Sequence, residues 1–313
     1  YDLTDRTSIS AGVRHTNDEK DFYRLQYSKV AGADFITPAQ WQGPFTNVLS
    51  PDEFSTNVRT NRSWSANTWR FVLNHNLTDD VMLYANASKG FISGGFAETC
   101  GANGGVACRI GYQPEESQSY EIGMKGDFLD GTLRVNAAAF NVTYEALQRT
   151  QVVKVYDNQG NEFQETMVVN NGESEARGIE VEVSWVPTAN FRVDANIGTL
   201  DHEYNKYMLE GDAGLAQIAE LGAPADVTAA TTTLDISSLT PPRSPDLTWA
   251  VSATYDMPLN SGANLTFNLS LDYSDEMETQ PFPKSAQGLD TNGNFIIEQK
   301  THTQAHEYTL VNA

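Results

Sequence analysis

The stretch Asn264-Leu265-Thr266-Phe267-Asn268-Leu269-Ser270-Leu271-Asp272-Tyr273 decides the fold. Apolar residues fall at every second position from Leu265 to Tyr273, and polar residues stand between them. Successive side chains of a strand point to opposite faces, so the stretch predicts a β-strand with one apolar and one polar face. Its length of about ten residues is also that of a tilted strand that crosses a membrane.

The same alternation recurs along the rest of the chain. It is clear from Phe191 to Gly198 and from Arg177 to Trp185. Further strands are predicted at 7–15, 64–76, 81–88, 119–128, 133–143, 247–257 and 306–313. A chain average cancels the two faces of such strands, so the negative mean hydropathy does not distinguish a soluble protein from a membrane barrel.

The connections between the predicted strands are alternately short and long. Short turns are predicted at 3–6, 77–80, 129–131, 187–190 and 258–262. Long polar connections are predicted at 17–62, 89–116, 144–172, 201–246 and 274–305. Tight turns at one end and long loops at the other are typical of outer-membrane barrels. The sequence therefore predicts an all-β fold, an antiparallel transmembrane β-barrel meander with short periplasmic turns and long extracellular loops.

Aromatic residues near the strand ends agree with a membrane barrel, whose interfaces carry aromatic girdles. Near the predicted short turns stand Phe128, Trp185, Phe191 and Tyr255. Near the long connections stand Tyr120, Trp249 and Tyr273. Each of these residues alone is also compatible with ordinary core packing, so the prediction rests on their joint arrangement.

The long connections contain local signals of their own. Segments 150–156 and 163–169 flank Asp157-Asn158-Gln159-Gly160 and predict a hairpin, and 212–221 predicts a short helix that Gly222 ends. The segment 290–298 partly resembles a calcium loop, but Phe295 stands at the sixth position, where such loops need glycine. Asn292-Gly293 is therefore predicted to be a hairpin turn, and no metal site is expected.

The composition argues against several classes of function. The chain has 41 acidic and 20 basic residues and a formal net charge of −21, which argues against nucleic acid as a partner. No run approaches 18 apolar residues and Tyr1 opens no signal peptide, so neither a transmembrane helix nor a leader is expected in this stretch. The five histidines are scattered and no nucleophile motif occurs, so we expect no enzyme and no cofactor.

Cys100 and Cys108 are the only cysteines, and they lie close together in a glycine-rich stretch. A short flexible loop can bring two thiols together, which favours a disulfide and an oxidising compartment. Two unpaired loop thiols are the alternative reading.

The order of several motifs resembles the barrels of TonB-dependent receptors. The resemblance rests on Leu77 to Phe96, then Pro114 to Lys125, Phe128 to Phe140, and Asn171 to Glu182, and it is most specific for 88–96 and 114–123. It implies a barrel of 22 strands whose lumen an N-terminal plug fills. About ten strands are recognisable in 1–313, so this range is expected to be a partial outer-membrane barrel domain, with the plug domain and coupling segment absent from it.

The resemblance implies active uptake of a bulky, scarce nutrient across the bacterial outer membrane. An iron chelate or siderophore, a cobalamin-like compound or an oligosaccharide would be such a cargo. The implied partners are outer-membrane lipid, lipopolysaccharide and, through the missing N-terminal region, the TonB complex. Two alternatives are a passive porin or barrel adhesin without a plug, and a soluble all-β binding module whose apolar faces pack together.

Two groups of residues are candidates for function. In this family, cargo is expected to meet the loops, and the candidate contacts near loop bases are Phe91, Phe96, Tyr112, Tyr204 and Tyr207. Loop packing is the competing explanation for each of them. If the apolar strand faces meet lipid, the charges that face the lumen and could hold a plug by ion pairs are Glu180, Glu182, Arg192, Asp194 and Asp272. A solvated barrel wall would also explain them.

Overall fold

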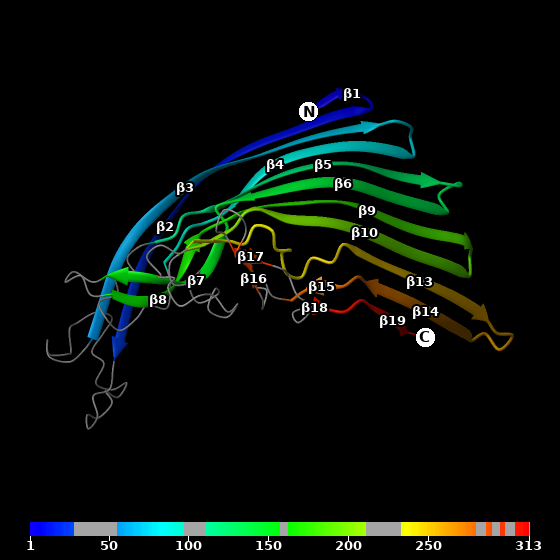
Figure 1. Ribbon diagram of the computed structural model, residues 1–313. Helices are drawn as coiled ribbons and strands as arrows, with labels where there is room; N and C mark the ends of the chain where they lie inside the picture. Colours follow the sequence, from blue (N-terminus) through cyan, green and yellow to red (C-terminus); the bar gives the residue numbers. More distant parts are fainter. Residues whose placement is uncertain are drawn as a thin grey trace, which may run out of the picture.

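The computed structural model describes residues 1–27, 55–96, 111–156, 162–210, 233–279, 286–289, 295–297 and 304–312. Its main feature is one curved antiparallel sheet of 11 strands (Figure 1). In their order across the sheet, the strands are β1 (Asp2–Thr4), β2 (Thr7–Tyr27), β3 (Ser55–Asn76), β4 (Val81–Ile92), β5 (Glu115–Phe128), β6 (Leu133–Glu145), β9 (Glu173–Thr188), β10 (Phe191–Lys206), β13 (Leu247–Pro258), β14 (Asn264–Ser274) and β19 (Tyr308–Asn312).

Four small two-stranded sheets occupy the connections between these strands. They are β7 (Gln148–Tyr156) with β8 (Glu162–Asn170), β11 (Met208–Glu210) with β12 (Thr233–Asp235), β15 (Met277–Glu278) with β18 (Gln304–Ala305), and β16 (Ala286–Leu289) with β17 (Phe295–Ile297). Within the described ranges, no helix is long and apolar enough to cross a membrane. The predicted all-β antiparallel meander is confirmed.

The paired strands of two predicted hairpins are present in the structure. The pair β7 and β8 confirms the hairpin expected around 157–160, although the turn itself lies outside the described residues. The paired strands β16 and β17 flank the expected turn at Asn292-Gly293, which is likewise outside them. The helix expected at 212–221 and the pair Cys100 and Cys108 also fall outside the described ranges, so both stay predictions.

Several strands are longer than the alternation indicates. The connection expected at 17–62 is wrong at both ends, because β2 continues to Tyr27 and β3 already begins at Ser55. At the start of the extension of β2, from Asn17 to Asp21, both faces are polar, as at Asp18 and Glu19, so the period-two signal disappears although the backbone pairing continues. The strand β10 likewise runs on to Lys206.

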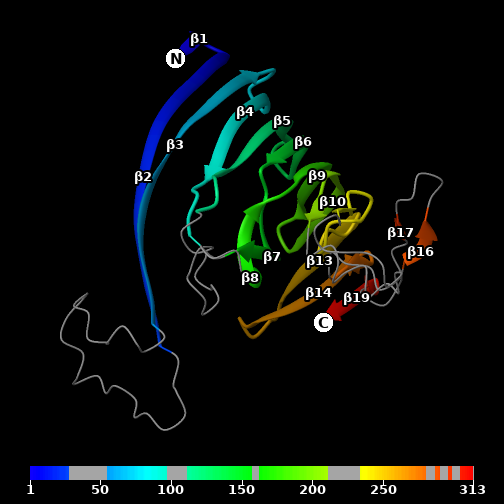
Figure 2. The same cartoon turned by 60° about the vertical axis from the view of Figure 1, so that its left-hand side comes forward.

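The wall divides at the outer part of β3, which is the end away from the short turns. The pairing of β3 with β4 stops at Trp69 and Lys89, whereas β3 and β2 stay paired out to Ser55 and Tyr27. Figure 2 shows the resulting two-stranded arm, formed by the outer parts of β2 and β3, curving away from the rest of the sheet.

The register collects the alternating side chains into rows that cross the sheet. One apolar row is Ile9, Leu73, Ala85, Ile122, Ala139, Ile179, Thr199 and Leu247. A row on the opposite face is Asn76, Met82, Lys125, Asn136, Glu182, Asn196, Ala250 and Asp272. Polar residues of this second face line a hollow of about 350 Å³, so we take it as the concave face.

The apolar face is convex and open. Ile122 is 64% exposed and Ile179 is 55% exposed, although such side chains usually stabilise a protein by being buried. On β10 the apolar stretch runs from Phe191 to Thr199 and then ends at the Arg177–Asp201 ion pair of 2.7 Å. The height of this apolar band matches the roughly 9–11 residues with which a tilted strand crosses a bilayer.

Aromatic residues border the apolar band on both sides. At the end with the short turns, Phe191 pairs with Tyr255, and Trp185 is in register with Leu133 beside Phe128. Toward the other end, the rings of Trp249 and Tyr273 stack with centroids 5.5 Å apart. Within each of the two predicted groups, these residues are therefore neighbours in the sheet.

Two aromatic rings on the concave face lie over glycines of the next strand. A Cβ atom on Gly123 would stand 2.5 Å from the ring of its register partner Tyr84. A Cβ atom on Gly178 would stand 2.8 Å from the ring of Phe140 and 2.0 Å from the carbonyl oxygen of Thr199. Only glycine leaves room for these contacts, so the two pairs fix how neighbouring strands approach each other.

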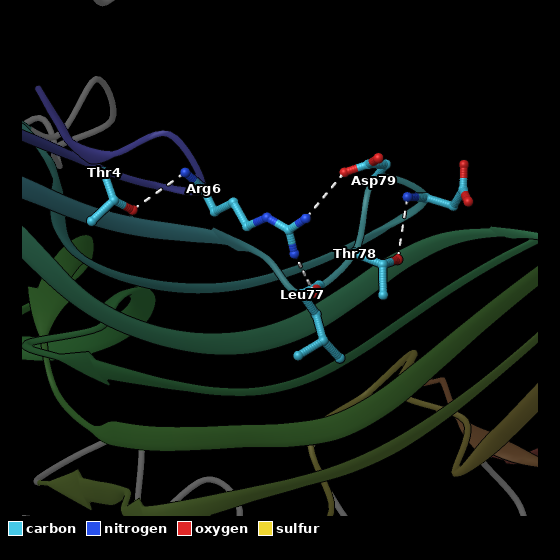
Figure 3. Close-up of polar contacts among 6 residues, drawn as sticks. Thr4, Arg6, Leu77, Thr78 and Asp79 are labelled. Carbon is cyan, nitrogen blue, oxygen red and sulfur yellow. Dashed lines mark hydrogen bonds and ion pairs between the residues drawn. The ribbon is translucent and has the colours of Figure 1, made fainter.

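The short turns are where the sequence placed them, and polar contacts brace them (Figure 3). Arg6 of the first turn donates to the carbonyl oxygen of Leu77 at 3.2 Å and reaches the carboxylate of Asp79 at 3.4 Å. Within the turns, the backbone amide of Asp80 donates to the hydroxyl oxygen of Thr78 at 3.2 Å. The first two turns are therefore joined to each other as well as to their own strands.

Candidate functional site

The outer end of the concave face carries the first candidate site, the Trp64 cluster, formed by Lys20, Phe22, Arg62, Trp64, Gly94, Phe96, Gly111 and Tyr112. Trp64 is only 4% exposed, and its ring meets that of Phe96 edge to face at 5.5 Å. Phe22 also stacks on Phe96, with ring centroids 5.4 Å apart. A bridge between Gly95 and Tyr112 holds the segment after β4 against the one before β5.

Two cations frame the indole of Trp64. Lys20 and Arg62 are direct register partners, and they stand 5.7 and 5.6 Å from the ring centroid. Lys20 donates to the carbonyl oxygen of Gly94 at 2.6 Å, and Arg62 donates to that of Gly111 at 3.2 Å. Like charges directly opposite each other in a sheet repel, so the ring face and the two carbonyl groups are what stabilise this pair.

The second candidate site, the Tyr204 cluster, is a small apolar core above the concave wall. Its members come from β10, from β11, and from the segments that follow β6, β10 and β12, and they are Leu147, Tyr204, Tyr207, Leu209, Ile236 and Leu239. Ile236 is fully buried, and the rings of Tyr204 and Tyr207 lie 4.8 Å apart. This core fixes connecting segments over the outer ends of the strands.

A half-buried histidine lies beside the Tyr204 cluster. The Nδ1 atom of His202 lies 2.9 Å from the hydroxyl oxygen of Ser244, which joins β10 to the segment before β13. Burial lowers the pKa of His202, and the positive charge of Arg149 acts in the same direction. Burial also raises the pKa of Tyr204. Both side chains are therefore neutral near pH 7 and can be buried without a counter-charge.

Hydrogen bonds join the connections around the two clusters. The side chain of Asn170 donates to the carbonyl oxygens of Gln113 and Ala146 at 2.9 and 2.8 Å. The buried carboxylate of Glu115 accepts from the backbone amide of Gln148 at 2.7 Å. The segments that follow β4, β6 and β8 therefore form one connected rim.

Replacing Ile236 with alanine is expected to loosen the Tyr204 cluster locally and leave the sheet intact. Truncation of a buried isoleucine costs about 2–5 kcal/mol, and here the cavity would open in a core of only a few side chains. Hydrogen exchange of the amides at 235–239 in the full-length protein would rise, and that of β13 would not. The exposed Ser238→Ala is the matched control; equal exchange in both variants would contradict the assignment of a local core.

Further toward the short turns, the concave wall is a polar hollow. The carboxamide of Asn136 donates to Glu182 at 3.2 Å, and Arg192 pairs with Asp194 at 2.6 Å. Asp272 lines the same hollow as Glu182 and Asp194. The structure thus brings together three of the five charges predicted to face the lumen, places Arg192 on Asp194, and puts Glu180 on the same face, next to Gly198.

The five residues predicted to contact the cargo lie in three different parts of the structure. Phe96 and Tyr112 belong to the Trp64 cluster, and Tyr204 and Tyr207 are 6% and 2% exposed within the other cluster. Phe91 is in register with Glu116 on the convex face, beside the Lys89–Glu116 ion pair of 2.7 Å. Ligand contact by these residues stays a prediction.

Sequence reasoning did not find the centre of either cluster. Trp64 reads as an ordinary strand residue, and its partners Lys20 and Arg62 lie in a stretch that was predicted to be a loop. Ile236 carries no periodic signal at all. Only the register that places Lys20 opposite Arg62 could have revealed the charge pair. No group of acidic, histidine or cysteine side chains in the described ranges could hold a metal ion.

Comparison with known proteins assigns the family. The family profile described as "TonB dependent receptor-like, beta-barrel" matches residues 1–313. The chain belongs to this TonB-dependent receptor family. The sequence resemblance and the expected barrel fold are thereby confirmed.

Named relatives of this receptor chain are receptors as well. The metal-pseudopaline receptor CntO of Pseudomonas aeruginosa is 30% identical over 141 residues, which are 45% of this chain and 17% of the relative. The probable TonB-dependent siderophore receptor PiuA of Acinetobacter baumannii is 34% identical over 93 residues, which are 30% of this chain and 11% of the relative. The matches thus span less than a fifth of each relative.

Solved receptors share the fold. The ferric yersiniabactin uptake receptor FyuA of Yersinia pestis superposes on this receptor chain with a TM-score of 0.62 at 16% identity, and the match covers 99% of this chain and 35% of FyuA. The ferric-catecholate import receptor Fiu of E. coli gives a TM-score of 0.58, again at 16% identity and with 99% and 35% of the two chains covered. At these identities the likeness concerns the fold alone.

Proposed function

We propose that this chain forms part of the wall of an outer-membrane barrel that takes up a bulky metal chelate by TonB-dependent transport. The observation that carries the proposal is the two-faced sheet, in which an apolar band on the convex face stands behind a polar concave wall. A band of about 9–11 residues per strand suits contact with the hydrocarbon layer, whereas the polar wall suits a watery lumen.

A plug domain is the proposed occupant of the polar hollow. Glu182, Asp194 and Asp272 line it together, and only Asp194 among them has an ion-pair partner in the described structure. A plug that presents arginine or lysine there would form charge-assisted hydrogen bonds with Glu182 and Asp272. On this proposal, residues 1–313 are one part of a barrel domain and the plug belongs to the same full-length protein.

Metal chelates are the proposed cargo class because of what the relatives are named for. CntO is named a metal-pseudopaline receptor and PiuA a probable siderophore receptor. The absence of a built metal cluster among the described residues agrees with a cargo that brings its own ligands to the metal. A cobalamin-like compound or an oligosaccharide is a cargo that the same fold could also carry.

Uptake by the source bacterium tests this function. Deleting the gene should abolish accumulation of one or more radiolabelled ferric or zinc chelates from a panel, and complementation with the full-length gene should restore it. Because TonB coupling needs the proton gradient, an uncoupler should reduce accumulation by the complemented strain to the deletion level.

A passive porin is the second candidate, favoured only by the polar hollow itself. Uptake that survives the uncoupler and rises linearly with cargo concentration would support the porin and sink the TonB-dependent proposal. Extraction from membranes by carbonate without detergent would sink both readings, because it would make the protein a soluble all-β module.

A further inference from the structure

The concave side of the β2–β3 hairpin carries a row of cations, the basic track, formed by Arg14, Lys20, Arg62 and Arg70. The register places Lys20 opposite Arg62, Arg14 opposite Thr68, and Arg70 opposite Gly12. All four side chains are at least partly exposed. Among the described residues on this face of the hairpin, Asp18 is the one acidic side chain, so four cations meet one carboxylate in a chain whose formal charge is −21.

The arginines of the basic track differ in their partners from three arginines elsewhere in the sheet. Arg134, Arg177 and Arg192 each pair with an aspartate at 2.6 to 2.7 Å. Within the described ranges, by contrast, no ion pair includes Arg14, Arg62 or Arg70, and Lys20 has only Asp18 at 3.5 Å. Among the described residues, no carboxylate therefore neutralises the three arginines of the basic track.

Nearby donors also lack acceptors. The indole Nε1 of Trp64 and the hydroxyl oxygen of Thr16 are buried, and no described residue is their hydrogen-bond partner. Both residues lie on the concave face between the Lys20–Arg62 pair and Arg14, because Trp64 is opposite Asp18 and Thr16 is opposite Ala66. The site thus combines unpaired cations with unsatisfied donors, which is the chemistry that an acceptor-rich anion would complete.

The remainder of the concave wall is acidic on balance, although Lys125, Arg134 and Arg192 also stand on it. Glu121, Glu180 and Glu182 stand on β5 and β9 of the same face, with Asp272 on β14. The acidic strands repel an anion on the concave side, and the basic track attracts it. The electrostatic field therefore draws an anion toward the β2–β3 hairpin. From Lys20 to Gly12 the track follows the strand for roughly 26 Å, from the outer end toward the apolar band.

We propose that the basic track is a binding surface for a small, multiply charged soluble anion bearing carboxylate or phosphate oxygens. The proposal rests on the proposed function, because it names the charge class of the cargo that enters along this wall. Phosphate groups of membrane lipid have the same chemistry, but the track faces the concave side, away from the band that would meet lipid. A soluble anion is therefore the ligand we commit to.

Calorimetric titration of inorganic pyrophosphate into the detergent-solubilised full-length receptor tests the proposal. The double variant Lys20→Gln with Arg62→Gln should bind pyrophosphate roughly tenfold or more weakly, since it loses two charge-assisted contacts. Binding to the unaltered receptor should weaken as ionic strength rises, because exposed charges are screened.

The matched control is Lys89→Gln with Arg177→Gln, which removes the same charges from the convex face. The affinity for pyrophosphate should be unchanged in this control. It should also be retained in the variant Arg62→Lys, which keeps the positive charge. Should the double variant fail to fold, Arg14→Gln replaces an exposed side chain and should still weaken binding severalfold. No binding at low ionic strength, or equal weakening in the convex-face control, would overturn the proposal.

The outcomes of these experiments also distinguish a failure of this proposal from a failure of the proposed function. Energised chelate uptake without pyrophosphate binding would defeat only the anion surface. Pyrophosphate binding at the basic track in a receptor whose uptake resists an uncoupler would defeat only the TonB-dependent function.

Discussion

Replacing Val251 with arginine is expected to lower the free energy of unfolding of the full-length receptor in lipid bilayers by about 2–4 kcal/mol. Val251 lies near the middle of β13, where its side chain belongs to the convex face between Ala195 and Leu271. A guanidinium there would enter the hydrocarbon layer at a depth where snorkelling to the interface is least effective. Urea-dependent unfolding in vesicles measures the change.

The neighbouring Ser252→Arg is the control, since it adds the same side chain to the same strand on the other face. Ser252 lines the polar hollow together with Asp194. Arginine at this position meets water and carboxylates, so stability should change by less than about 1 kcal/mol. Equal losses in the two variants would mean that the convex face does not contact lipid.

Alanine at Gly123 and alanine at Gly178 should both destabilise the barrel, but only the first loss should be reversible by a second substitution. The added methyl group at Gly123 meets the ring of Tyr84, and overpacking of this kind costs about 1–3 kcal/mol. The methyl group at Gly178 meets the backbone carbonyl of Thr199, which cannot rotate away. Its cost should lie at or above the top of that range.

Double variants supply the decisive comparison. Tyr84→Ala should recover much of the stability lost in Gly123→Ala, because it removes the atoms that clash. Phe140→Ala should not rescue Gly178→Ala, because the Thr199 carbonyl remains. The coupling energies from unfolding of the single and double variants measure this difference. Full rescue at Gly178 would show that the ring contact, and not the strand spacing, determines the need for glycine.

The strands that the sequence predicted correctly are those that have two different environments. From Leu265 to Tyr273 one face is apolar and the other polar, so composition alone reports the pleat, and the register of β13 with β14 agrees with it. The short turns were equally legible, because their chemistry is local. At Leu129, Asp130 and Gly131 the backbone has positive φ angles of 52°, 56° and 80°.

The parts that the sequence did not reveal lack such a contrast. From Asn17 to Asp21 the residues on both faces of β2 are polar, so a paired strand has the composition of a loop there. The Tyr204 cluster gathers Leu147, Tyr207 and Ile236 from separate connections, and only tertiary contacts make them a core. Tyr204 and Tyr207 were predicted from their place near loop bases, which cannot distinguish an exposed ring from a buried one.

Because the pairing of β3 with β4 ends at Lys89, β3 has different neighbouring strands along its length. From Trp69 to Asn76 the strand has partners on both sides, whereas from Ser55 to Thr68 it is paired with β2 alone among the described strands. A two-stranded ribbon is at best marginally stable in water. Among the described residues, the outer part of β3 therefore depends on β2 and on the Trp64 cluster, and loss of that cluster should let the outer part, which carries Lys20 and Arg62, open while the inner part stays folded.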